Sequence, residues 1–167
     1  MSFLTRARVI AEDAKMPLVL AATAFMMACS SSGHAGAAAK GWPSSAAELR
    51  SRWNSLTNAE AQLSDFKGDK ATFDLGRVTF MSNHMMTLET HDHSAAPELC
   101  VIGYMAAFGA SHDEAKYEVR AAIDDMHTSE TAGHGPSGYK KGHGHQIGMG
   151  VAPSGLATCT YLDESGD

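Results

Sequence analysis

The side chains in this sequence best suited to chemistry are histidines placed two residues apart. His91 and His93 follow Glu89 at this spacing. On an extended strand the three would share one face, with the two histidines roughly 6.6 Å apart at the backbone, so that both imidazoles could reach one metal ion. Glu89 and His93 are twice as far apart, so a further ligand must come from elsewhere. His143 and His145 are the candidates for that ligand.

A second group, Met81, His84, Met85 and Met86, combines thioether sulfur with imidazole. This mixture of ligands suits copper outside the cytoplasm. Methionine also fills irregular apolar cores, and histidine pairs are common on exposed strand edges. The structural interpretation is favoured for both groups, and binding of copper or zinc is the alternative.

Active-site motifs give little support for catalysis. The sequence contains no Gly-x-Ser-x-Gly nucleophile motif and no Gly-x-x-x-x-Gly-Lys-Ser/Thr phosphate loop. No strand leads into the glycine-rich segment 133–150 and no helix opens from it, so the setting for phosphate binding is missing and a mobile surface loop is expected. We therefore expect a protein that is not an enzyme.

The leader is the most informative segment of the chain. Twelve apolar or small residues, Pro17 to Ala28, run into Cys29 and then into Ser30-Ser31-Ser32-Gly33. The run has the length of a secretory signal and is too short to cross a bilayer, which takes about 20 residues. With Met26-Met27-Ala28-Cys29 as a lipobox, the leader resembles the signal peptide of a bacterial lipoprotein. The resemblance is confined to the leader and the serines that follow it.

The resemblance implies a mature chain that begins at a diacylated Cys29. Attachment by more than one fatty chain, such as palmitate, gives stable anchoring. The implied location is the bacterial cell envelope, and the outer membrane if the host has one, because Ser30 replaces the aspartate of inner-membrane retention signals. Cleavage near Ala35-Gly36-Ala37, giving a soluble secreted or periplasmic protein, is one alternative. A buried internal helix over residues 17–28 is another.

The net charge of the mature chain limits the classes of partner that it can bind. Removing residues 1–28 takes away three basic and two acidic side chains, so the formal net charge changes from −6 to −7. Such a domain has no electrostatic footprint for nucleic acid or for anionic lipid. The expected partners are the membrane, reached through the lipid anchor, and a protein of the envelope.

The chain divides into a signal peptide (1–28), a lipidated flexible tether (29–43) and a single domain (44–167) with a Gly/His-rich loop (131–150). Cys100 and Cys159 remain after lipidation of the first cysteine. Outside the cytoplasm we expect them to form a disulfide that joins the last strand to a central strand, with two buried thiols as the alternative. Closing this loop would contribute around 4 kcal/mol.

Two capping boxes mark the expected helices. Ser45 with Glu48 opens a helix over residues 45–64, and Ser111 with Glu114 opens a second. The expected strands are a hairpin over 72–80 and 86–90, a central strand over 99–108 and a last strand over 157–162. This order predicts an α+β domain with a small antiparallel sheet of about four strands, two helices packed on one face and one disulfide.

These observations favour a membrane-anchored envelope lipoprotein that acts as a non-enzymatic binding or interaction module. A periplasmic or surface lipoprotein that handles copper or zinc is the alternative. Its ligands would be His91, His93, His143 and His145 together with Met81, His84 and Met85. A cell-envelope hydrolase is a second alternative, and it requires a substrate pocket.

Overall fold

The structure, a computed structural model, describes residues 41–81, 84–131, 137–142 and 144–164. The leader, Cys29 and the tether up to residue 40 lie outside these residues, and so do the alternative cleavage site and the possible internal helix over 17–28. No helix in the described segments is long and apolar enough to cross a membrane.

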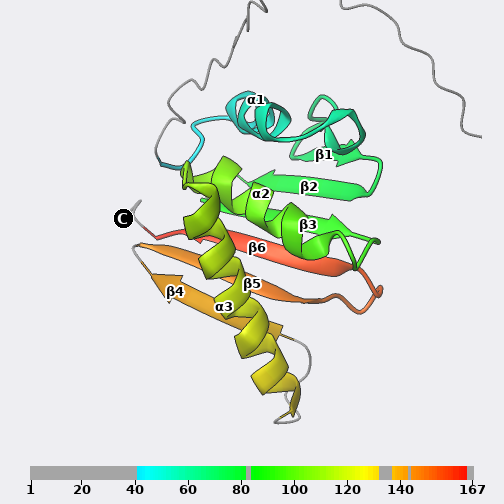
Figure 1. The fold of residues 1–167 in the computed structure, drawn as a ribbon. Coiled ribbons are helices and arrows are strands. Elements are labelled where there is room, and N and C mark those ends of the chain that lie inside the picture. The colour runs from blue at the N-terminus through cyan, green and yellow to red at the C-terminus, as the bar shows by residue number, and fades with distance from the viewer. Residues whose placement is uncertain (1–40, 82–83, 132–136, 143, 165–167) are drawn as a thin grey trace, which may run out of the picture. The chain divides into compact units, whose positions relative to one another are not determined.

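Six strands of the described chain form one antiparallel sheet with the order β1-β2-β3-β6-β5-β4 (Figure 1). The strands are β1 (Lys70–Phe73), β2 (Gly76–Met81), β3 (Met85–Thr90), β4 (Ser137–Gly142), β5 (His145–Val151) and β6 (Ala157–Asp163). The α+β class and the antiparallel sheet are confirmed. The expected number of about four strands was too low, because the segment 72–80, predicted as one strand, forms β1 and β2, and the segment predicted as a loop contributes β4 and β5.

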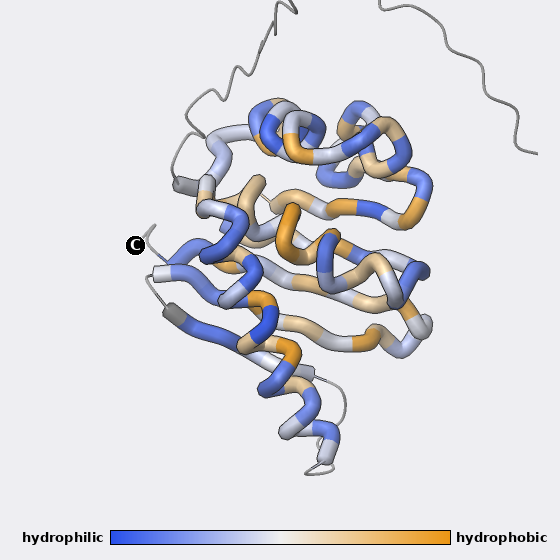
Figure 2. The backbone as a smooth tube through the Cα atoms, viewed as in Figure 1, coloured by the Kyte–Doolittle hydropathy of each residue, from blue (hydrophilic) through white to orange (hydrophobic). Residues whose placement is uncertain are grey.

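Three α-helices in this part of the chain cover one face of the sheet (Figure 1). They are α1 (Ala46–Leu56), α2 (Ala96–Phe108) and α3 (His112–Thr131), and a short 3-10 helix, η1 (Ala59–Ala61), follows the first. Figure 2 shows hydrophobic positions concentrated in α2 and in the strands behind it. The core therefore lies between the helices and one face of the sheet.

The first helix begins where the capping box predicts. Ser45 Oγ accepts a hydrogen bond from the Glu48 amide at 3.2 Å. The helix ends at Leu56 and not at residue 64, because Asn54 takes up the returning chain: its Oδ1 accepts from the Leu63 amide at 2.7 Å and its Nδ2 donates to the Leu63 carbonyl at 3.2 Å. The side-chain amide thus replaces the continuing helix.

The segment 99–108, predicted as a central strand, is helical and forms most of α2. Periodicity does not separate a strand from a helix when the apolar run is continuous, and α2 is buried along most of its length. Two signals do point to a helix: Pro97 lies in its first turn, and Gly109 caps its end with φ 65° and an amide bonded to the Met105 carbonyl at 2.8 Å.

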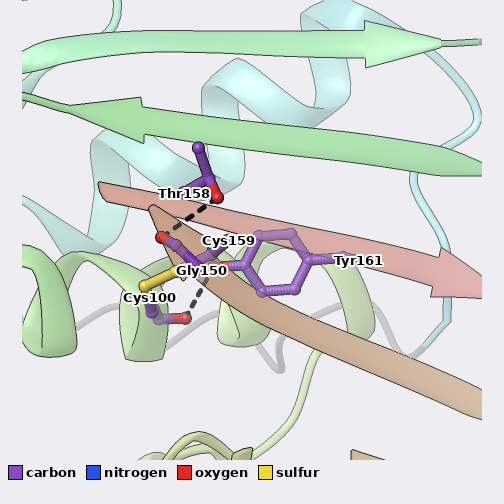
Figure 3. The surroundings of a disulfide bond; sticks show 5 residues. All are labelled: Cys100, Gly150, Thr158, Cys159 and Tyr161. Carbon is purple, nitrogen blue, oxygen red and sulfur yellow. Dashed lines mark hydrogen bonds between the residues drawn. A yellow bond between two sulfur atoms is a disulfide. The ribbon is translucent and has the colours of Figure 1, made fainter. Parts of the chain in front are cut away.

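The disulfide between Cys100 and Cys159 is confirmed, with Cα atoms 6.0 Å apart. It joins α2 to β6 rather than one strand to another (Figure 3). Beside it, the Tyr161 hydroxyl donates to the Cys100 carbonyl at 2.9 Å. A Cβ atom on Gly103 would lie 2.4 Å from the same hydroxyl, so this glycine lets α2 sit directly on the tyrosine ring.

The prediction of a loop for the Gly/His-rich segment 131–150 was wrong. Its described residues form the hairpin of β4 and β5, not a surface loop. Gly138 explains why the segment needs glycine, since a Cβ atom there would lie 2.2 Å from the Ala122 carbonyl oxygen of α3. The helix packs against the strand backbone at this point. Residues 132–136 and His143 are outside the described chain.

Candidate functional site

One end of the sheet gathers several of the predicted site residues. The end of β2, the start of β3, the start of β5 and the end of β6 lie on the same side of the domain (Figure 1). His84 is the residue before β3, and its carbonyl accepts from the Asp163 amide at 2.9 Å. Its φ of 62° is rare for a residue other than glycine. His145 is directly opposite Asp163 in the pairing of β5 with β6.

Two imidazoles flank one carboxylate at this end. His84 Nδ1 lies 3.3 Å from Asp163 Oδ2, and His145 Nδ1 lies 3.6 Å from Asp163 Oδ1. The Asp163 side chain is only 6% exposed, whereas His84 is 45% exposed. A carboxylate taken out of water needs polar or charged partners. His84 Nδ1 is within hydrogen-bonding distance of Asp163, whereas His145 Nδ1 is buried and makes no hydrogen bond within the described chain. His84 is the member of this group that reaches the surface.

An aromatic cluster supports these histidines. The Phe108 ring stacks on the His145 ring with centroids 4.0 Å apart. Trp42 packs on Phe108 at 5.6 Å and stacks on Phe80 at 5.8 Å, with 20° between the planes. The Trp42 and His84 centroids are 6.3 Å apart. The ring of Trp42 therefore connects the segment before α1 to the end of the sheet.

A cleft of about 900 Å³ opens beside this cluster. Its apolar wall includes Trp42, Phe80 and Met81, and its polar groups include Asp69 and His84. Residues 43–46 complete the rim together with Gly68. Clefts of this size with an apolar wall and a few polar groups are typical of ligand sites.

The wall contributed by residues 41–46 is fixed to the domain. One guanidinium nitrogen of Arg52 donates to the Gly41 carbonyl at 2.6 Å and to the Ala106 carbonyl at 3.3 Å. The Gly41 amide donates to the Phe108 carbonyl at 3.2 Å. Trp42 and Pro43, assigned to the tether from the sequence, are thus packed against the domain. The cleft is bounded by positioned side chains on this side.

The structure separates the predicted site residues into two groups. Met81, His84, Met85 and His145 lie at the end just described, where Met81 and Met85 are paired across β2 and β3. Met86 is fully buried and belongs to the core. His143 is not among the described residues.

The other group lies at the opposite end of β3. That strand ends at Thr90, so His91 and His93 are not on a strand face as expected. His93 Nε2 is 3.0 Å from the Gly155 carbonyl oxygen in the turn before β6. Glu89 forms an ion pair with Arg77 on the neighbouring strand. Among the described residues, no group of three or more His, Cys, Asp or Glu side chains is arranged to hold a metal ion.

Trp42, Phe108 and Asp163 were not predicted as site residues from the sequence. For Trp42 a signal was present: an aromatic residue followed by proline directly before a capping box marks packed chain rather than flexible tether. Phe108 was assigned to a core strand. Asp163 is one residue beyond the predicted last strand, and nothing in its neighbourhood in the sequence relates it to His84, 79 residues earlier.

The sheet face without helices is rich in threonine. Thr79, Thr87 and Thr160 lie opposite one another on β2, β3 and β6. In the same row on β4, the Tyr139 ring lies over Gly148, where a Cβ atom would be 2.8 Å from it. The cleft combines an aromatic wall with polar groups in one hollow, so it is the stronger candidate for a binding site.

Comparison of the chain with protein-family models, with curated proteins and with solved structures finds no match.

Proposed function

We propose that this chain is a lipid-anchored module of the bacterial cell envelope that acts by binding, with its ligand in the cleft beside Trp42. The observation that carries the proposal is the cleft itself. It has the volume of a small-ligand site, an aromatic wall and a few polar groups at its rim. Its walls are held by the hydrogen bonds of Arg52 and by ring stacking on Phe80 and Phe108.

The position of the cleft fits an anchored protein. The chain enters the domain at Gly41, next to the cleft wall, and the proposed lipid anchor at Cys29 is 12 residues earlier. A chain of 12 residues spans at most about 43 Å even when it is fully extended. The ligand would therefore be bound close to the membrane surface.

The polar groups around the cleft support binding rather than turnover. The Ser44 hydroxyl donates to the Glu48 carboxylate at 2.7 Å, and this bond holds the start of α1. His84 Nδ1 faces Asp163. Both side chains serve to hold the walls of the cleft, as expected for a site that is preorganised for a ligand.

The test places a photoreactive amino acid at the cleft in the living host. It replaces Met81, which lines the cleft and is 36% exposed, or Tyr117, which is 67% exposed on α3 and is the matched control. We expect a covalent adduct of defined mass from the Met81 position only, and its loss when Trp42→Leu is added. Equal adducts from both positions, or an adduct that survives Trp42→Leu, would contradict the proposal.

Two further results belong to the same test. Cys29→Ser should move the protein out of the membrane fraction, because the modified sulfur is the expected attachment point. Turnover of a cell-wall or peptide substrate by the purified protein would instead support the hydrolase alternative and overturn a purely binding role.

A further inference from the structure

We propose that the cleft beside Trp42 binds a positively charged group, namely the ammonium or guanidinium of a basic side chain on an envelope protein. This inference rests on the proposed function and specifies its ligand. It is carried by the juxtaposition of an exposed carboxylate, Asp69, with an aromatic wall in one cleft. A carboxylate and an aromatic face are the two groups that recognise such cations.

The charges of the lining residues favour a cation. Asp69 is exposed and has no ion-pair partner among the described residues. Among the described residues, no lysine or arginine lines the cleft. Lys67 and Lys70 flank Asp69 in the sequence, but neither is a lining residue, and Lys70 lies close enough to Glu89 to lower the pKa of that carboxyl, after the larger effect of Arg77. The carboxylate is thus available to a ligand.

The position of Asp69 is fixed by its backbone. Gly68, with φ 66°, lies in the tight turn between Lys67 and Lys70. The Lys67 amide donates to the Lys70 carbonyl at 2.8 Å and closes this turn. The Asp69 carbonyl accepts from the Phe80 amide at 2.8 Å. Asp69 is therefore held beside the strand that carries one of the aromatic wall residues.

The aromatic wall supplies the second contact. Trp42 is only partly buried, with its ring packed on Phe80 and Phe108, so part of the ring borders the cleft. The negative face of a tryptophan ring attracts a cation, and the attraction is stronger where water is excluded. A basic side chain also has an apolar stem that can lie along the wall.

The other ligand classes fit less well. An anion would meet Asp69 with no lysine or arginine among the described lining residues to pair with, and the net negative charge of the chain repels it. An acyl chain would bury the Asp69 carboxylate without a polar partner, which costs free energy. The net charge attracts a basic partner over distances of about the Debye length, roughly 10 Å at 0.1 M salt.

The test uses the mature lipidated protein in detergent micelles and three peptides, each N-acetylated and C-amidated so that only side chains carry charge: Gly-Lys-Gly-Lys-Gly, Gly-Gln-Gly-Gln-Gly and Gly-Glu-Gly-Glu-Gly. Binding is followed by the fluorescence of Trp42, because the other tryptophan, Trp53, is fully buried. We expect the lysine peptide to bind, more weakly as salt increases, and the other two not to bind. Asp69→Asn should weaken binding at least fivefold. The matched control Asp74→Asn, an exposed carboxylate in the β1–β2 turn, should change it less than twofold.

Several outcomes would overturn the inference: equal binding by the Asp69→Asn variant, equal binding of the glutamine or glutamate peptide, or no binding of the lysine peptide. Binding of a neutral or acidic peptide at Trp42 would leave the cleft as a ligand site and remove only the preference for cations. Loss of the Trp42-dependent photoadduct would remove the proposed function itself. Because Asp69 is exposed, its amide variant should fold, and an unchanged melting temperature checks this.

Discussion

At the scale of single residues, the hydroxyl of Tyr161 marks the centre of the core. The side chain is fully buried, and its hydroxyl donates to a carbonyl in the middle of α2. Burial disfavours the phenolate and raises the pKa of Tyr161 well above its ordinary value of 10.0. One buried hydrogen bond thus orients the central helix on the central strand beside the disulfide.

Tyr161→Phe should destabilise the domain by about 1 kcal/mol, because the Cys100 carbonyl loses a buried donor. Denaturant unfolding at pH 7 measures the change. Tyr117→Phe, at an exposed position, should have no effect. Since the folded state holds the phenol proton more tightly, wild-type stability should fall as pH rises above 10, and this loss should be smaller in Tyr161→Phe. Equal free energies of unfolding for Tyr161→Phe and Tyr117→Phe would contradict the role assigned to Tyr161.

The Glu48 carboxylate stabilises the start of α1 through its hydrogen bonds. The hydroxyl and amide of Ser44 donate to its carboxylate, Arg52 pairs with it, and together they lower the pKa of Glu48 from 4.5 to about 2. The depressed pKa means that the ionised form stabilises the fold. This contribution is present above pH 4.5 and is lost as pH falls through about 2.

Glu48→Gln should therefore lower stability by about 1 kcal/mol at pH 7, the usual effect of a lost helix cap. The difference from wild type should shrink between pH 4.5 and pH 2, as the wild-type carboxylate becomes protonated. Thermal unfolding across this range tests the prediction, with Glu60→Gln as a control at an exposed position. A difference that stays constant with pH would show that the carboxylate charge is not the cause.

At the scale of elements, the described domain consists of two similar halves. Each half is a helix followed by three antiparallel strands, α1 with β1 to β3 and α3 with β4 to β6. The last strands of the two halves, β3 and β6, pair in the centre of the sheet, and α2 packs on both (Figure 1). The disulfide ties this connecting helix to the second half.

Gly138→Ala should push α3 away from the β4–β5 hairpin and destabilise the domain. The added methyl group would meet the backbone of α3 at Ala122 and Met126. Overpacking of this kind costs about 1–3 kcal/mol. Ser137→Ala, one residue earlier and on the opposite sheet face, should change stability by less than about 0.5 kcal/mol. Calorimetric melting of both variants measures the contrast, and a stable Gly138→Ala variant would show that the helix can shift.

Elements with local signals could be predicted from the sequence. The capping serines at 45 and 111 located two helices, and the pattern around Val78 and Leu88 located a hairpin. The identity of α2 could not be read from its apolar run, because a helix and a strand buried on all sides have the same composition. The β4–β5 hairpin was hidden by its glycines: Gly138 makes room for α3 and Gly148 for the Tyr139 ring, which are tertiary reasons with no local pattern.

The candidate site was predictable only in part, for a related reason. His84, Met81 and Met85 are close in the sequence and stay close in the fold. Asp163 and Trp42 join them only because β6 pairs with β3 and because the segment before α1 folds over Phe80. Long-range pairing of this kind leaves no trace in the spacing of residues along the chain.

At the scale of the whole molecule, the proposed lipid anchor precedes a domain with a preformed cleft. Twelve residues separate the proposed lipid attachment point from the cleft wall. A disulfide that closes a loop of 59 residues stabilises the fold by about 4 kcal/mol in an oxidising compartment. The proposal therefore claims that the protein is exported, anchored by its acyl chains and oxidised at Cys100 and Cys159.

The intact mass of the protein extracted from the host's own membranes tests that claim most directly. We expect a chain that begins at Cys29, carries the added mass of its acyl chains and is lighter by two hydrogens because Cys100 and Cys159 are bonded. An unprocessed chain of 167 residues in the soluble fraction, with three free thiols, would contradict the account.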